Sequence, residues 1–174
     1  MNWNIDQTHS EVQFKVKHLV ISTVTGNFTS FEGTVLATSE DSFDNAAVAF
    51  SLNVDSISTN QIDRDNHLKS AEFFDVEKFP KITFSNGKLT KKNNNDYDLN
   101  GHLTIKETTK PITLQVTLGG IMKDPWGNTK AGFEINGVIN RKDFGMTWNA
   151  ITEAGGLLVG EDIKLALNIQ LAKA

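Results

Sequence analysis

Residues 11–18 read EVQFKVKH, and this stretch decides the fold. Apolar residues at positions 12, 14 and 16 alternate with polar residues at positions 13, 15 and 17, and His18 continues the apolar side. Successive side chains of a β-strand point to opposite faces of a sheet. The period of two therefore predicts a strand with one buried and one exposed face.

Seven more runs with the same alternation follow along the chain. They are Phe28, Phe31, Gly33 and Val35; Val48, Phe50, Leu52 and Val54; Ile82 and Phe84; Tyr97, Leu99, Gly101, Leu103 and Ile105; Ile112, Leu114, Val116 and Leu118; Phe133, Ile135, Gly137 and Ile139; and Ile163, Leu165, Leu167, Ile169 and Leu171. Because the alternation slips between Phe28 and Phe31, we expect a bulge or bend there.

Residues typical of turns stand between these runs. They are Asn86-Gly87, residues 93–96, Gly119-Gly120, Gly127-Asn128 and Gly155-Gly156. Only residues 60–80 break the strand pattern, since they are rich in charge and lack alternation. We expect one or two short helices here, starting at Asn60 with Asp63 three residues on. Pro80 ends this segment and opens the next strand.

Eight consecutive strands joined mostly by short turns pair antiparallel with their neighbours. Closing the sheet into a barrel removes its exposed edges, and eight strands enclose room for side chains or one small ligand. The sequence therefore predicts an all-β, eight-stranded antiparallel barrel with a short helical insertion between the third and fourth strands. A β-sandwich is the alternative, and residues 1–174 are expected to form a single domain.

Composition narrows the possible partners and compartments. The chain has 174 residues, no cysteine and a net charge of −4, which predicts no nucleic-acid partner and no anionic-membrane partner. No apolar stretch approaches the roughly 20 residues that span a bilayer, so no stable membrane insertion is expected. The first ten residues do not resemble a signal peptide. We expect a cytoplasmic protein, or a periplasmic one if a leader has been removed.

The predicted inward face is aromatic, with phenylalanine at positions 14, 28, 31, 50, 84 and 133. Gly33, Gly101 and Gly137 take inward positions where a β-branched residue is expected. These glycines are expected to leave volume unfilled, which favours a ligand cavity. A core packed solid with phenylalanine is the alternative interpretation.

Two polar residues, His18 and Arg141, fall on the inward face near strand ends. A buried charge is costly without a partner. Arg141 either pairs with a carboxylate such as Asp143 or Asp75, or binds the polar head of a ligand at the barrel mouth. His18 is either a hydrogen-bonded histidine at a strand end or a second polar contact.

Motifs that carry chemistry are missing. The histidines at positions 9, 18, 67 and 102 show no metal-ligand spacing, and there is no nucleophile elbow, P-loop or dinucleotide fingerprint. The sequence therefore predicts no metal, no cofactor and no enzymatic activity.

Several short motifs occur together in one order and spacing. They are Trp3, Asp6, His9-Ser10, Phe14, His18, Gly26, Phe28 and Gly33; His67-Leu68, Phe73-Phe74, Pro80 and Thr83-Phe84; Gly101 with residues 103–105; and residues 141–146, RKDFGM. In this arrangement the chain resembles the YceI-like family of lipid-binding proteins. The resemblance covers residues from about position 3 to the final strand.

The resemblance implies a lipocalin-like barrel with a long hydrophobic cavity for a polyisoprenoid or similar long-chain lipid. It also implies that Phe73 and Phe74 pack over the tunnel and that a homodimer is possible. The expected ligand-binding residues are Phe14, Val16, His18, Phe28, Phe31, Phe50, Leu52, Phe73, Phe74, Phe84, Leu103, Phe133, Ile135, Ile139 and Arg141. The alternatives to a lipid carrier are a structural barrel with a solid core and, third, an enzyme acting on isoprenoid compounds.

Overall fold

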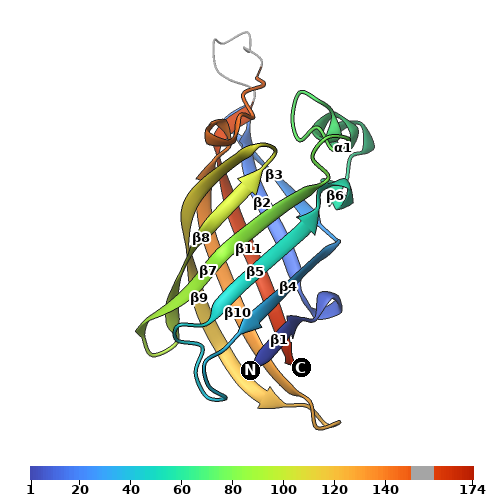
Figure 1. The fold of residues 1–174 in the computed structure, drawn as a ribbon. Helices are drawn as coiled ribbons and strands as arrows, with labels where there is room; N and C mark the ends of the chain where they lie inside the picture. Colours follow the sequence, from blue (N-terminus) through green and yellow to red (C-terminus); the bar gives the residue numbers. More distant parts are fainter. Residues whose placement is uncertain (150–158) are drawn as a thin grey trace.

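Strands follow the alternating runs in the computed structural model, which describes residues 1–149 and 159–174 (Figure 1). They are β1 (Asn2–Ile5), β2 (Glu11–His18), β3 (Ser22–Phe28), β4 (Phe31–Leu36), β5 (Ala47–Asn53), β6 (Ile57–Ser58), β7 (Lys81–Asn93), β8 (Asp96–Ile105), β9 (Thr108–Lys123), β10 (Thr129–Asn140) and β11 (Val159–Lys173). All pairings between neighbouring strands are antiparallel.

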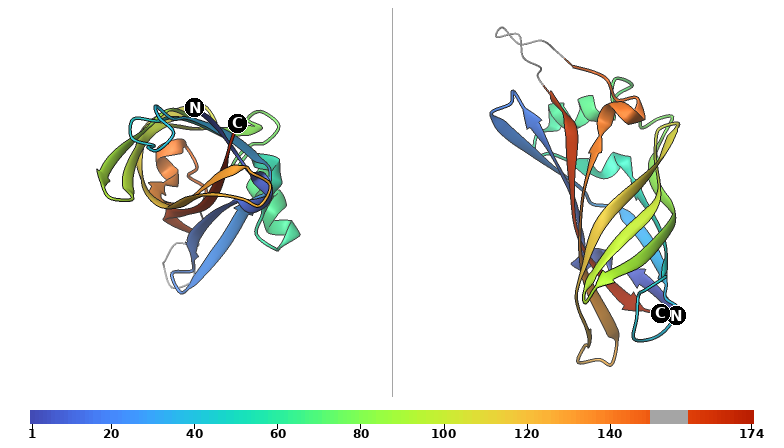
Figure 2. Two further views of the ribbon diagram at one scale, coloured as in Figure 1. Left: turned by 90° about the horizontal axis from the view of Figure 1, so that it is seen from below. Right: turned by 90° about the vertical axis from the view of Figure 1, so that its left-hand side faces the viewer.

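The barrel closes because the last strand returns to the first. One side of β11 pairs with β10, while its other side pairs first with β2 and then with β1. Strands β1 and β2 thus lie end to end and act as one wall strand, and β4 and β3 beside them do the same. The ring runs β1–β4–β5–β7–β8–β9–β10–β11 and back to β1 (Figure 2). The predicted eight-stranded antiparallel barrel is confirmed.

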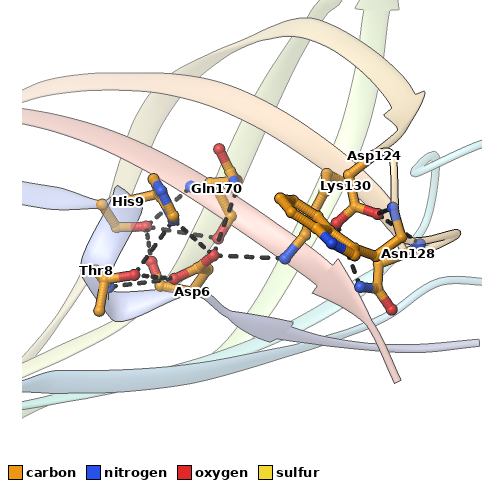
Figure 3. A network of polar contacts seen from close by, with 9 residues as sticks. Asp6, Thr8, His9, Asp124, Asn128, Lys130 and Gln170 are labelled. Atoms are coloured by element: carbon orange, nitrogen blue, oxygen red, sulfur yellow. Dashed lines mark hydrogen bonds and ion pairs between the residues drawn. The ribbon is translucent and has the colours of Figure 1, made fainter.

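A polar network holds the bend between β1 and β2. The Asp6 carboxylate caps the 3₁₀ turn η1 (Gln7–His9), accepting hydrogen bonds from the backbone N–H and hydroxyl of Thr8. It also lies 2.9 Å from His9 Nδ1, and Lys130 Nζ lies 3.5 Å away (Figure 3). The hydrogen bond with His9 lowers the pKa of Asp6 to about 2, partial burial opposes this, and Thr8 and Lys130 lower it further.

The predicted slip between Phe28 and Phe31 is confirmed as the break between β3 and β4. Ser56 fixes this corner, because its hydroxyl accepts hydrogen bonds from the backbone N–H groups of Thr29 and Ser30 at 3.1 Å. Beyond the corner, the side of β3 that faces away from β2 has no long partner among the described strands, because it pairs there only with the two-residue β6, whereas β4 pairs with β5. The wall therefore opens toward one end of the barrel, called here the upper end.

Two predicted turns are β-bulges inside long strands. Asn86-Gly87 lies within β7, where the pairing with β8 shifts between Ser85 and Lys88. Gly119-Gly120 lies within β9, opposite a shift in β10. A bulge uses the same residues as a turn, because both need positive φ or an unpaired backbone group. The predicted turn at positions 155–156 lies outside the described residues.

The charged insertion contains one helix, α1 (Ile62–Lys69), at the upper end. The predicted start is wrong by one residue, since Gln61 provides the cap by accepting a hydrogen bond from Arg64 N at 2.5 Å, while Asn60 has φ of 62°. Asp65 Oδ1 accepts hydrogen bonds from both N and Oγ1 of the buried Thr59. These contacts tie the helix to the strand end before it.

The lower end, which carries both chain termini, is closed by side chains. Phe43, in the loop between β4 and β5, is 1% exposed and lies between two other rings. Its centroid is 5.2 Å from that of Trp3 and 5.0 Å from that of Phe133. Neither alternation nor motif placed Phe43 there, because it belongs to a loop.

Candidate functional site

The barrel encloses a cavity of about 210 Å³. Its walls are apolar side chains of the described strands, with Gln13, Thr34 and Arg141 as the polar exceptions. Trp3 and Phe43 block the lower end, so the cavity is blind there. At the upper end it is bordered by segments outside the ring, including the turn η3 (Arg141–Phe144) and the residues after α1.

Every expected contact residue except His18 and Phe31 lines this cavity. Those that line it are Phe14, Val16, Phe28, Phe50, Leu52, Phe73, Phe74, Phe84, Leu103, Phe133, Ile135, Ile139 and Arg141. His18 lies half-buried at the end of β2, outside the cavity, where its carbonyl accepts a hydrogen bond from the Ser22 hydroxyl. Phe31, the first residue of β4, is buried but does not line the cavity, and its ring stacks on Phe50 with a centroid distance of 6.1 Å.

Further lining residues were left out of the expected set. Most follow the same alternation and include Val12, Ile82, Leu89, Leu99, Ile105, Ile112, Leu114, Val116, Ile163, Leu165, Leu167, Ile169 and Leu171. Leu68 and Met146 also line the cavity, but they come from segments without alternation. For these two, the only signal in the sequence was their place in the motifs His67-Leu68 and RKDFGM.

The inward glycines do not leave space, which corrects the expectation made for them. A β-carbon built on Gly101 would lie 2.3 Å from Cζ of Phe84, and one on Gly137 would lie 2.3 Å from Cδ2 of Leu114. At Gly33 the nearest atom is Cδ1 of Ile5 at 2.7 Å. Neighbouring side chains therefore already fill the space beside these glycines.

Arg141 pairs with neither Asp143 nor Asp75, the two carboxylates suggested for it. It is 2% exposed, and its guanidinium donates to four backbone carbonyls: Gly160 at 2.8 Å, Met146 at 2.7 Å, Trp148 at 2.8 Å and Val159 at 3.2 Å. Burial lowers the pKa of Arg141, and Glu161 raises it in part. Among the described residues, these hydrogen bonds connect η3 and the residues after it to the start of β11.

Aromatic side chains meet at the upper end, between the two segments that border the cavity. The His67 ring lies edge-on to Phe73 and to Trp148, with centroid distances of 5.0 and 4.8 Å. Phe73 and Trp148 lie 5.2 Å apart. Since His67 and Phe73 come from the α1 region and Trp148 follows η3, this cluster joins the two segments beside the mouth.

The described residues hold no group of three or more histidine, aspartate or glutamate side chains placed to bind a metal ion. Across the same residues, no helix has the length and apolar character needed to cross a membrane.

A family model described as the YceI-like domain matches residues 3–171. The chain belongs to the YceI-like family. Among curated relatives, a UPF0312 protein of Pectobacterium atrosepticum is 39% identical over 162 residues, covering 93% of this chain and 80% of the relative. Protein YceI of Salmonella newport is 38% identical over 162 residues, covering 93% and 81%.

Solved structures agree with this membership. The Campylobacter jejuni YCEI protein superposes with a TM-score of 0.76 at 32% identity, covering 97% of this YceI-like chain and 96% of the other. BcnA of Burkholderia cenocepacia gives 0.80 at 18% identity, covering 95% and 98%. A polyisoprenoid binding domain from Saccharophagus degradans gives 0.71 at 13% identity, covering 99% and 98%. The last two identities support the shared fold alone.

Proposed function

We propose that this YceI-like protein binds one long-chain lipid, of the polyisoprenoid class or similar, inside its barrel and so carries, stores or sequesters it. The observation that supports this most directly is the blind, apolar cavity of about 210 Å³ along the barrel. A closed apolar space excludes water from a hydrocarbon chain, which is the main source of affinity for such a ligand. The polyisoprenoid binding neighbour supplies the ligand class for this proposal.

The ligand enters tail first, with its head group at the upper end. The lower end is filled by Phe43, and Arg141, the one ionisable side chain lining the described cavity, already donates to four carbonyls. An anionic head group would gain little from a guanidinium whose donors are held this way. The preferred ligand is therefore uncharged, or keeps its head group in solvent.

The two rival functions make different demands on the same wall. A structural barrel needs no internal space, because its core can be packed solid. In this barrel Leu165 and Leu167 line the cavity and are only partly buried, so the interior is not packed solid. An enzyme acting on isoprenoid compounds needs a proton donor or acceptor against the substrate. The described cavity wall offers only Arg141 for this purpose, and its carbonyl contacts suit a structural role.

Native mass spectrometry with organic extraction tests the proposal. We expect the purified protein to carry close to one long-chain molecule, or to take up geranylgeraniol supplied from ethanol. Leu165→Trp, which puts a larger side chain into the cavity, should abolish uptake, while Asn168→Trp, on the outer face of the same strand, should leave it unchanged. A protein that stays free of lipid under both conditions would favour the structural barrel.

A further inference from the structure

The turn between β2 and β3 presents three consecutive apolar side chains to solvent at the upper end of the barrel. Leu19 is 40% exposed, Val20 is 73% exposed and Ile21 is 87% exposed. The hairpin leans away from the ring at the end that carries α1 and η3 (Figure 2). Single exposed apolar residues are ordinary, but a run of three at one tip indicates an interaction site.

Backbone conformation makes this run harder to explain as a simple turn. Leu19 and Val20 have φ of 55° and 65°. Glycine and asparagine adopt positive φ easily, whereas a β-branched residue there is strained. Among the described residues, the other non-glycine positions with positive φ are all polar: Asn45, Asn60, Asp75, Asn86 and Lys106. Folding alone would favour asparagine at Val20, so the conformation of the turn does not account for the apolar side chains.

Positive charge accompanies the apolar tip. Lys15 and Lys17 are exposed on the outer face of β2, and Lys164 lies opposite Lys15 in the register with β11. The acidic residues nearest on β11 are Glu161, which pairs with Lys142 at 2.8 Å, and Asp162. The net charge of −4 predicted no anionic-membrane partner, but these three lysines make the hairpin locally basic.

We infer that the β2–β3 tip docks reversibly on a lipid bilayer, with Val20 and Ile21 in the interface and the lysines near anionic head groups. This inference rests on the proposed function, because a lipid carrier must meet the bilayer that supplies or receives its ligand. The tip and the bordering segments of the cavity lie at the same end, so docking brings the mouth to the bilayer surface. Surface docking of this kind requires no stable membrane insertion.

The opposite end of the barrel provides a matched control. Trp126, at the tip of the β9–β10 hairpin, is 83% exposed, and Asp124 Oδ1 orders that turn by accepting from the backbone N–H groups of Trp126 and Asn128. Although burial raises the pKa of Asp124, these backbone N–H groups and the Asn128 side chain bring it below its usual value. Trp126→Ser therefore removes an equally exposed apolar side chain far from the mouth.

Flotation with vesicles of phosphatidylcholine and phosphatidylglycerol in equal parts is the test. We expect Val20→Asn with Ile21→Ser to weaken vesicle binding at least tenfold, since each side chain removed changes partitioning by about that factor. The same protein should melt at an equal or higher temperature, because asparagine relieves the positive φ. Trp126→Ser should bind as the unaltered protein does. Lys15→Gln with Lys17→Gln should weaken binding more on these vesicles than on phosphatidylcholine alone.

A ligand-transfer measurement separates this inference from the proposed function. The variant Val20→Asn with Ile21→Ser should take up geranylgeraniol from ethanol as the unaltered protein does. It should extract the same lipid from vesicles at least tenfold more slowly. The docking inference would be overturned if Val20→Asn with Ile21→Ser bound vesicles as the unaltered protein does, or if Trp126→Ser lost as much vesicle binding. It would also be overturned if the tip substitutions changed the oligomeric state and not the vesicle binding. If the unaltered protein also failed to take up geranylgeraniol from ethanol, the proposed function would be wrong. Vesicle binding would still test whether the β2–β3 tip docks on a bilayer.

Discussion

The ring of Phe84 lies across the backbone of Gly101, so closely that a β-carbon on the glycine would fall 2.3 Å from Cζ of the ring. Gly101→Ala must push this ring toward the cavity, and we expect a loss of about 1–3 kcal/mol in the free energy of unfolding. Urea denaturation measures the loss. Lipid uptake should fall as well, because the displaced ring occupies ligand space.

Gly132 is the control for this substitution, since it also lies in a strand but has nothing within 4 Å of its β-carbon position. Gly132→Ala should leave stability unchanged or raise it by up to about 1 kcal/mol. In addition, Phe84→Leu should reduce the cost of Gly101→Ala in a double-mutant cycle. A cost that does not depend on residue 84 would contradict the ring-over-glycine relationship.

Arg141 should matter for stability and not for the choice of head group. Arg141→Met leaves four carbonyl oxygens without their donor, and we expect a loss of about 2–4 kcal/mol in the free energy of unfolding. If Arg141→Lys folds, its affinities for geranylgeraniol and for geranylgeranyl diphosphate should fall by equal factors in competition binding. A larger effect on the diphosphate would restore the head-group role that the sequence first suggested for Arg141.

Alternation predicted the wall of the cavity because it depends only on which face each residue occupies. Val16 and Phe133 were found in this way, and both line the cavity. What the sequence could not show was register: Phe84 pairs with Leu103, which places its ring diagonally across Gly101. Residues that act as diagonal neighbours across strands carry no signal in a single sequence.

The partners of Arg141 and the plug at Phe43 were missed for a related reason. Each depends on where an irregular segment folds back on the barrel, and such segments have no period to read. Backbone carbonyls are also available at every residue, so nothing in the sequence favours the four that bind Arg141 over the carboxylates of Asp75 or Asp143. The apolar lining was predictable, while the ends of the barrel were not.

The Asp6 carboxylate should make the stability of the fold depend on acid pH. Its folded-state pKa is about 2, below the usual 3.8, so the ionised form stabilises the native state. This contribution is complete above about pH 4 and is lost as the pH falls through about 2. Asp6→Asn should therefore cost about 1–2 kcal/mol at pH 5 and much less near pH 2 in urea titrations.

The exposed Asp41, in the loop after β4, provides the control for net charge. Asp41→Asn should leave the pH dependence of the free energy of unfolding as it is in the unaltered protein, whereas Asp6→Asn should reduce it. If both variants followed the unaltered protein from pH 5 to pH 2, the network around Asp6 would contribute nothing to acid stability.

Cavity size sets a limit on how much of the ligand is buried. A water-sized sphere needs about 10–15 Å³, so the cavity of about 210 Å³ holds roughly 15–20 heavy atoms of a chain. At about 0.3 kcal/mol per buried heavy atom, this part of the ligand contributes about −4.5 to −6 kcal/mol. Affinity should therefore rise from farnesol to geranylgeraniol and then level off for solanesol, whose further isoprene units stay outside. A fluorescent-ligand displacement series measures this directly. A continued rise through solanesol would mean that the wall yields to longer chains, with Phe73 and Trp148 at the mouth as the first side chains to move.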